Sequence, residues 1–122
     1  MKTISQFIRD HLLETMGYAE KKERLPELEE LQRTEWCEEF DILRKNRMIM
    51  GAFRYKRLSH PDKFNYDLLG GLRKKLGEYE KTGNTECLVD AANYLMLEFM
   101  KPSHKNAHFA AKDDYIHCPS LK

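Results

Sequence analysis

TGNTECLVDAANYLMLEFM, residues 82–100, is the stretch that decides the fold. A turn around Gly83 precedes a long apolar run, and glycine readily takes the left-handed conformation at a helix end. The pattern predicts that one helix ends just before this turn and that another spans residues 85–100, stopping before Pro102. Two helices joined by so short a connection are expected to be antiparallel neighbours.

Further helices are predicted upstream. Thr3 and Gln6 have the spacing of a capping box, which predicts a helix over Ile4–Met16. Pro26 suits the first turn of a short helix, because its fixed φ is compatible with that position. Longer helices are expected over about 34–57 and 66–81. In the second of these, Gly70-Gly71 marks either a kink or a close approach of another helix.

The segment 34–57 carries two apolar stripes, about 100° apart at 100° per residue. Two stripes on one helix imply burial against more than one neighbour. The first stripe contains Trp36, Phe40, Leu43 and Met50, and the second contains Ile42, Ile49 and Phe53.

The chain has 122 residues, which suits one domain with a single core. We therefore predict one all-α domain over residues 1–122, a compact bundle of four to five helices. Residues 103–122 lack periodicity and are expected to form a loop-like C-terminal tail. The predicted core contains Phe7, Leu12, Trp36, Phe40, Leu43, Leu69, Leu72, Leu76, Leu88, Leu95 and Phe99.

Charge, hydropathy and cysteine content indicate the cellular compartment in which the protein is expected. The formal net charge is +1, and no apolar run is long enough to span a bilayer. Charged residues inside the first amphipathic segment argue against a signal peptide. Three widely spaced cysteines suit free thiols better than a disulfide framework. A cytoplasmic protein without a membrane partner is expected.

A polar side interrupts the apolar helix over 85–100. Glu86, Asp90 and Asn93 fall within about 60° of one another around the helix. Glu35, Glu38 and Glu39 have the spacing i, i+3 and i+4 on the helix expected over about 34–57, so all three can project from it in the same direction. Carboxylates are the ligands that Mg²⁺ prefers. The predicted Mg²⁺ ligands are Glu35, Glu38, Glu39, Glu86 and Asp90.

Residues 86–96, ECLVDAANYLM, resemble the ExxD-type helix of the all-α nucleotide pyrophosphohydrolases, the MazG-like group. In that family an earlier helix with an ExxE-type motif supplies further metal carboxylates, and residues 35–39, EWCEE, are the stretch that corresponds to it. The resemblance covers residues 34–100. It implies Mg²⁺-dependent hydrolysis of a nucleoside triphosphate to the monophosphate, often by an oligomer. Asn93 would then hold the base or a ligand carboxylate.

Basic side chains on two helices suggest a site for phosphates. Arg44, Arg47, Arg54 and Lys75 supply N–H donors that would bind triphosphate oxygens. Such clusters also occur at nucleic-acid interfaces. Here 20 acidic residues nearly balance 21 basic ones, which argues against direct nucleic-acid binding.

Zinc is an alternative metal. His104, His108, His117 and Cys118 lie within a short segment and include donors that zinc prefers. Against a zinc site, Pro102 interrupts regular helix there, and adjacent ligands are geometrically awkward. Loop histidines more often cap or pack.

Two alternatives to an enzyme remain open. In the first, Glu86 stabilises a helix N-terminus, Asp90 and Asn93 bond to neighbouring backbone, and the glutamates near residue 35 are solvated. In the second, the protein is a non-enzymatic phage or mobile-element accessory protein that inhibits a host defence complex. An anti-CRISPR protein is the analogy, and it rests on size, mixed charge and the lack of a clean catalytic motif.

Overall fold

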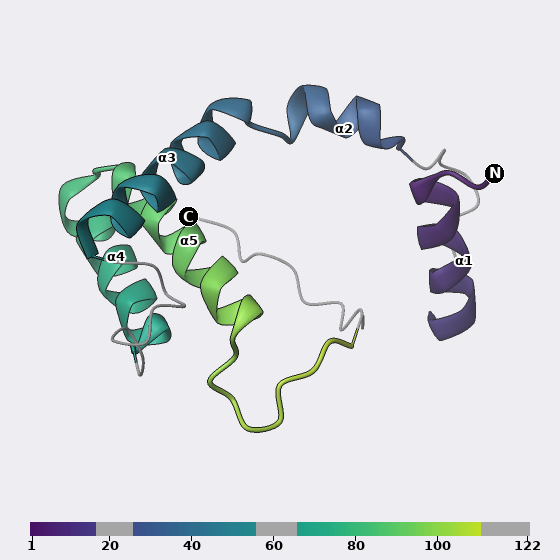
Figure 1. Cartoon of the computed structure of the whole chain (residues 1–122). Helices are drawn as coiled ribbons and strands as arrows, with labels where there is room; N and C mark the ends of the chain where they lie inside the picture. The colour runs from purple at the N-terminus through teal and green to yellow at the C-terminus, as the bar shows by residue number, and fades with distance from the viewer. Residues whose placement is uncertain (17–25, 56–65, 111–122) are drawn as a thin grey trace. The chain divides into compact units, whose positions relative to one another are not determined.

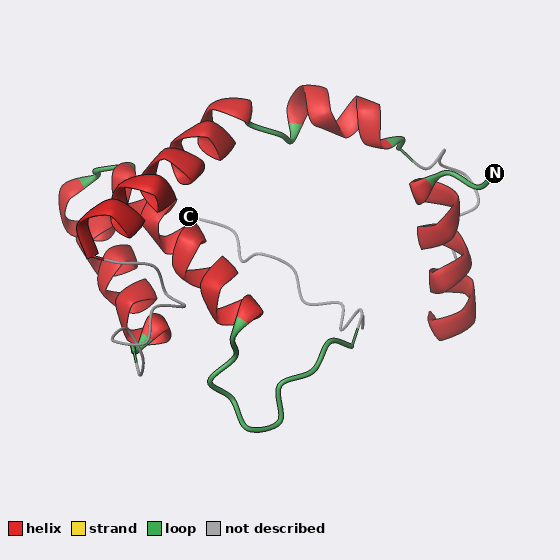
Figure 2. Cartoon of the chain, in the orientation of Figure 1, coloured by secondary structure: helices red, strands yellow, loops and turns green. Residues whose placement is uncertain are grey.

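The computed structural model describes residues 1–16, 26–55 and 66–110. These residues form helices and no strand (Figures 1 and 2). The all-α class is therefore confirmed for the described part of the chain. The helices are α1 (Ile4–Met16), α2 (Leu28–Thr34), α3 (Glu38–Tyr55), α4 (Leu68–Thr82) and α5 (Glu86–Met100).

Contacts divide the chain into two units. One is Cys37–Ala107, which contains α3, α4 and α5. The other comprises the described residues of Met1–Trp36 and His108–Lys122. The prediction of a single domain over residues 1–122 stays a prediction. The expected loop character of the C-terminal tail is confirmed from residue 103 to residue 110, and the rest of that tail lies outside the described residues.

The capping box at the start of α1 is confirmed. Gln6 Oε1 accepts a hydrogen bond from the Thr3 backbone N at 2.9 Å, and Thr3 Oγ1 accepts one from the Gln6 backbone N at 3.2 Å. The short second helix is also confirmed, but its N-cap is Glu27. Pro26 therefore precedes the cap instead of occupying the first turn.

The long predicted helix begins at Glu38, so the expected start near residue 34 is wrong. The chain leaves the helical region at Glu35, where φ is −115° and ψ is 21°. Cys37 Sγ then accepts a hydrogen bond from the Phe40 backbone N at 3.3 Å, as an N-cap side chain does. Glu38 and Glu39 consequently occupy the first turn of α3, where the helix dipole favours negative charge.

Helix α4 begins at an acidic side-chain cap and ends at the predicted left-handed glycine. Asp67 Oδ1 accepts from the Gly70 backbone N at 2.9 Å, and Gly83 ends the helix with a left-handed φ of 72°. A Cβ added at Gly71 would lie 2.8 Å from ring atoms of Tyr94 in α5. Gly71 thus permits a close approach of two helices, which is one of the two roles predicted for the glycine pair.

Helix α5 packs against both α4 and α3. The residues with less than a tenth of their surface exposed are Cys87, Val89, Ala91 and Asn93, all in its first half. The described core is therefore built from small side chains where the helices are close. Trp36 lies in the segment between α2 and α3, and the side chain of Leu12 is outside the described residues. Several large predicted core residues are exposed. These are Phe7, Trp36, Leu43, Leu76, Leu95 and Phe99. Phe40, Leu69, Leu72 and Leu88 are half-buried.

Candidate functional site

The two neighbours of α5 cover different sides of it, with Asp90 between them. At 100° per residue, Cys87 lies about 60° to one side of Asp90 and Asn93 about 60° to the other. Cys87 Sγ donates to Glu78 Oε2 of α4 at 3.7 Å. Asn93 Nδ2 donates to the backbone carbonyl of Arg44 in α3 at 2.9 Å. The predicted polar side of α5 thus lies between α3 and α4.

The Asp90 carboxylate binds one basic side chain from each neighbouring helix. From α3, Arg47 Nε lies 3.1 Å from Oδ1 and Arg47 Nη2 lies 3.4 Å from Oδ2. From α4, Lys75 Nζ lies 3.4 Å from Oδ2. The Asp90 side chain is only 12% exposed, so these contacts are partly shielded from solvent. A two-pronged guanidinium contact also fixes the orientation of the carboxylate.

Two further carboxylates extend this group, which we call the Asp90 cluster: Glu78, Glu86 and Asp90 with Arg47 and Lys75. Arg47 Nη2 lies 3.6 Å from Glu86 Oε1. Lys75 Nζ lies 3.7 Å from Glu78 Oε2. The cluster joins all three helices of the unit and holds one carboxylate more than it holds cations.

The pKa is raised for two groups in this region, Lys75 within the cluster and Cys87 beside it. Burial alone would lower the pKa of Lys75, but the charges of Asp90 and Glu78 outweigh it, so the net pKa is raised and the ammonium stays charged. Burial, with the nearby Glu78 charge, raises the pKa of the Cys87 thiol. Cys87 is therefore a protonated hydrogen-bond donor and not a thiolate nucleophile.

Asn93 holds a buried amide with one unsatisfied atom. Its side chain lies between α5 and α3, and the residue is 6% exposed. Nδ2 reaches the carbonyl of Arg44, but Oδ1 has no partner among the residues that the structure describes. Buried carbonyl oxygens are usually hydrogen-bonded, so this atom is a place where a water or a ligand donor would bind. In the non-enzymatic alternative Asn93 is expected to bond to backbone near it in the sequence, whereas its partner is the Arg44 carbonyl of a different helix.

The carboxylates predicted for Mg²⁺ are only partly gathered. Glu86 and Asp90 both contact Arg47. Glu38 and Glu39 are exposed in the first turn of α3, at about 180° and 80° around the helix from Arg47. Glu35 is exposed after α2, in the other unit. Within the described ranges, no three His, Cys, Asp or Glu side chains are arranged to hold a metal ion.

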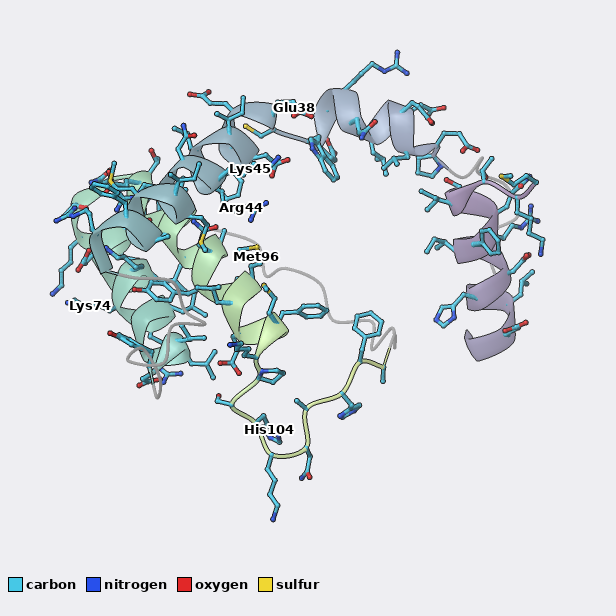
Figure 3. All side chains as sticks on the ribbon, viewed as in Figure 1. Glu38, Arg44, Lys45, Lys74, Met96 and His104 are labelled. Carbon is cyan, nitrogen blue, oxygen red and sulfur yellow. The ribbon has the colours of Figure 1, made fainter. Side chains whose placement is uncertain are left out.

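The basic residues predicted for phosphate are better placed. Arg47 of α3 and Lys75 of α4 meet at Asp90. Arg44 lies on the same side of α3 as Arg47 and donates to Met96 Sδ at 3.0 Å, between α3 and α5 (Figure 3). Arg54 follows Arg47 by seven residues and so falls within about 20° of it around the helix. Cationic groups from two helices therefore line this side of α5.

The zinc prediction is not tested as a whole, because His117 and Cys118 lie outside the described residues. His104 is exposed in the loop that follows α5 (Figure 3), and His108 is exposed further along the chain. His104 Nδ1 accepts a hydrogen bond from the Asn106 backbone N at 2.9 Å. His104 thus has the capping role that loop histidines commonly have.

Two members of this region were not singled out from the sequence. Glu78 follows Lys75 by three residues on α4, and this spacing is a common ion-pair signal. Its contact with Cys87 depends on the packing of α4 against α5, which no local pattern shows. Met96 likewise appears as ordinary apolar packing until Arg44 is seen to donate to its sulfur.

No protein-family model matches the chain, and no significant match is found among curated proteins or solved structures. Among the described residues, no helix is long and apolar enough to cross a membrane.

Proposed function

We propose that the Asp90 cluster binds a nucleoside triphosphate together with a divalent cation. The observation that carries the proposal is the convergence of Arg47 and Lys75, from two helices, on one nearly buried carboxylate. Basic side chains gathered in this way are suited to phosphate oxygens. Asp90 and Glu86 are suited to Mg²⁺, which prefers oxygen ligands and often bridges to phosphates.

The cluster explains how such a complex would remain electrically balanced. Without a ligand, Arg47 and Lys75 neutralise carboxylates that would otherwise repel one another. A divalent cation would replace them at Asp90 and Glu86, and the released cationic groups would turn to the phosphates. In the bound state the metal would polarise a phosphoryl oxygen, which favours hydrolysis to the monophosphate. The resemblance to MazG-like enzymes supports the same chemistry.

The test is thermal melting of the full chain with Mg²⁺ or Mn²⁺, alone and with a panel of nucleoside triphosphates. Stabilisation that needs both metal and nucleotide is expected. Chromatography of the nucleotides then shows whether monophosphate and pyrophosphate form. If no combination of metal and nucleotide stabilises the protein, the proposal fails.

Matched variants locate the effect. Lys75→Gln is expected to weaken nucleotide binding about tenfold, the effect of losing roughly 1.4 kcal/mol. Lys74→Gln removes an exposed neighbouring charge on α4 and is expected to bind normally (Figure 3). Glu86→Gln removes one carboxylate at an exposed position. It is expected to weaken metal binding and to leave the fold unchanged. Equal binding by all three variants would place the ligand elsewhere.

A second candidate is the non-enzymatic inhibitor of a host defence complex, which an exposed apolar end of α5 favours. Leu95, Phe99 and Met100 are 54%, 74% and 64% exposed. Large apolar side chains grouped on a surface often bind proteins. Co-purification with a host nuclease complex is the test. This function predicts that Phe99→Ala loses the partner whereas Lys75→Gln keeps it.

A further inference from the structure

We propose that Arg47 is an internal competitor of the divalent cation: its guanidinium occupies the metal-binding carboxylates until an anion draws it away. The inference rests on the proposed function, because it takes Glu86 and Asp90 as the ligands of that cation. It assigns Arg47 a role that Lys75 does not share. Without an anion Arg47 keeps the metal out, and with one it binds the phosphate.

Arg47 spans both carboxylates, whereas Lys75 contacts Asp90 and Glu78. Arg47 Nη2 lies 3.4 Å from Asp90 Oδ2 and 3.6 Å from Glu86 Oε1. Arg47 Nε lies 3.1 Å from the other carboxylate oxygen of Asp90. One positively charged group thus stands between the two carboxylates, in the place that a bridging cation would need.

Two carboxylates are enough for the cation concerned. Glu86 and Asp90 are i and i+4 on α5, so their side chains are neighbours on one face. Mg²⁺ is commonly held by one or two protein carboxylates, while water and phosphate fill its other positions. Its oxygen ligands lie at about 2.1 Å, so both carboxylates have to close in on the metal. Glu86 has the freedom to do so, because its side chain is 54% exposed, but the guanidinium has to leave first.

Moving Arg47 away from the carboxylates costs several contacts. Besides its bonds to Asp90, its Nη1 donates to Met50 Sδ on the same helix at 3.3 Å. The Arg47 side chain is 32% exposed, so water screens these contacts only in part. A metal ion alone has to supply the free energy that breaks them. Phosphate oxygens are strong acceptors for a guanidinium and offset the loss, so the anion and the cation are expected to bind cooperatively.

Helix α3 stays attached to α5 when Arg47 turns, because other contacts hold it there. Asn93 Nδ2 donates to the Arg44 carbonyl at 2.9 Å, and Arg44 Nη1 donates to Met96 Sδ at 3.0 Å. Both contacts involve Arg44, about one turn before Arg47. The change is therefore a rotation of one side chain, and Arg47→Gln is expected to keep the fold.

Calorimetric titration of the full chain with Mn²⁺ alone, without nucleotide, tests the proposal. Arg47→Gln is expected to bind Mn²⁺ at least tenfold more tightly than the wild type, because both carboxylates are then open to the metal. Lys45→Gln is the matched control (Figure 3). It removes the same charge from an exposed position of α3, about 160° around the helix from Arg47, and is expected to bind Mn²⁺ like the wild type.

Two further variants locate the effect. Adding Glu86→Gln to Arg47→Gln is expected to remove most of the gain, because the double-mutant cycle isolates a carboxylate that Arg47 covers. Arg47→Lys keeps the charge but replaces the planar fork with a single ammonium. Its affinity for Mn²⁺ is expected to lie between those of the wild type and Arg47→Gln. Circular dichroism checks the helical content of each variant, and Arg47→Lys carries the test if Arg47→Gln unfolds.

Two results would overturn the proposal. One is a folded Arg47→Gln, or Arg47→Lys in its place, that binds Mn²⁺ no more tightly than the wild type. The other is an equal gain in Lys45→Gln, which would reflect net charge alone. If metal and nucleotide together stabilise the wild type while Arg47→Gln shows no gain, this inference fails and the proposed function stands. If Arg47→Gln gains affinity while no nucleotide stabilises the wild type, the proposed nucleotide binding fails and the competition at the carboxylates stands.

Discussion

Gly71 is a position where an added side chain would disturb the packing of α4 on α5. An added Cβ would lie 2.8 Å from Tyr94 ring atoms, whereas one at Gly77 would meet nothing within 4 Å. We predict that Gly71→Ala destabilises the protein by about 1 to 3 kcal/mol, since the ring has to move. Gly77→Ala is expected to stabilise it by roughly 0.5 to 1 kcal/mol, because alanine favours helix more than glycine does.

Urea unfolding monitored by circular dichroism measures both free energies. The two variants are the same substitution in the same helix, so each serves as the control for the other. Equal shifts in the same direction would show that the close approach of α4 to α5 is absent.

Asp90 and Glu86 differ in burial, and we predict that they differ in their effect on stability. Asp90→Asn leaves Arg47 and Lys75 without their shared carboxylate, and the Asp90 side chain is only 12% exposed. We expect the free energy of unfolding to fall by about 1 to 3 kcal/mol. The Glu86 side chain is 54% exposed, and Glu86→Gln is expected to change the free energy of unfolding by less than about 0.5 kcal/mol. Denaturant titration of the two variants checks the ranking, and a larger loss for Glu86→Gln would contradict it.

The described cysteines are predicted to react at different rates. Cys37 is exposed, whereas Cys87 is buried, donates to Glu78 and has a raised pKa. Because the thiolate is the reactive form, iodoacetamide should modify Cys37 well before Cys87 in the folded protein. Peptide mass spectrometry after timed alkylation measures both rates. The unfolded protein is the control, in which the two rates should converge.

At the scale of the helices, two N-caps in the same unit offer a direct comparison. Asp67 caps α4 through its side chain, whereas Thr85 precedes α5 without a side-chain cap bond. We predict that Asp67→Ala lowers stability by about 1 kcal/mol and that Thr85→Ala has little effect. Thermal melting of both variants measures the difference. A larger loss for Thr85→Ala would contradict the observed capping.

The helix boundaries that the sequence predicts well are those marked by a local start or stop signal. The Thr3–Gln6 capping box and the left-handed Gly83 each depend on a few adjacent residues. The break before α3 was missed, because the apolar pattern continues through Trp36. That boundary depends on the Cys37 thiol as a cap, and cysteine is not among the usual capping residues.

The candidate site was predictable only in part for a different reason. One helix supplies Glu86 and Asp90, so their common side follows from periodicity alone. Which side of α3 faces them depends on packing between segments far apart in the chain. The structure turns Arg47 toward Asp90, and it leaves Glu38 and Glu39 exposed. The large apolar residues mispredicted as core, such as Phe99, reflect the same lack of long-range information.

At the scale of the whole molecule, the contacts place α3, α4 and α5 in one unit. The Asp90 cluster, the Gly71 contact and the buried side chains of α5 all lie inside Cys37–Ala107. We predict that a fragment of these residues is helical and melts cooperatively without the rest of the chain. Circular dichroism of the fragment checks this, with the full chain as the control. A broad, gradual loss of signal would show that the unit needs the other residues.

The short connection between α4 and α5 has a consequence for the order of folding. The α4–α5 contact closes only a small loop through Gly83, whereas Arg47 and Asp90 are 43 residues apart. Closing the longer loop costs more chain entropy, so the α4–α5 hairpin is the favoured nucleus and α3 docks onto it later. Stabilising the hairpin would then accelerate folding, whereas strengthening the tie from Arg47 to Asp90 would mainly slow unfolding.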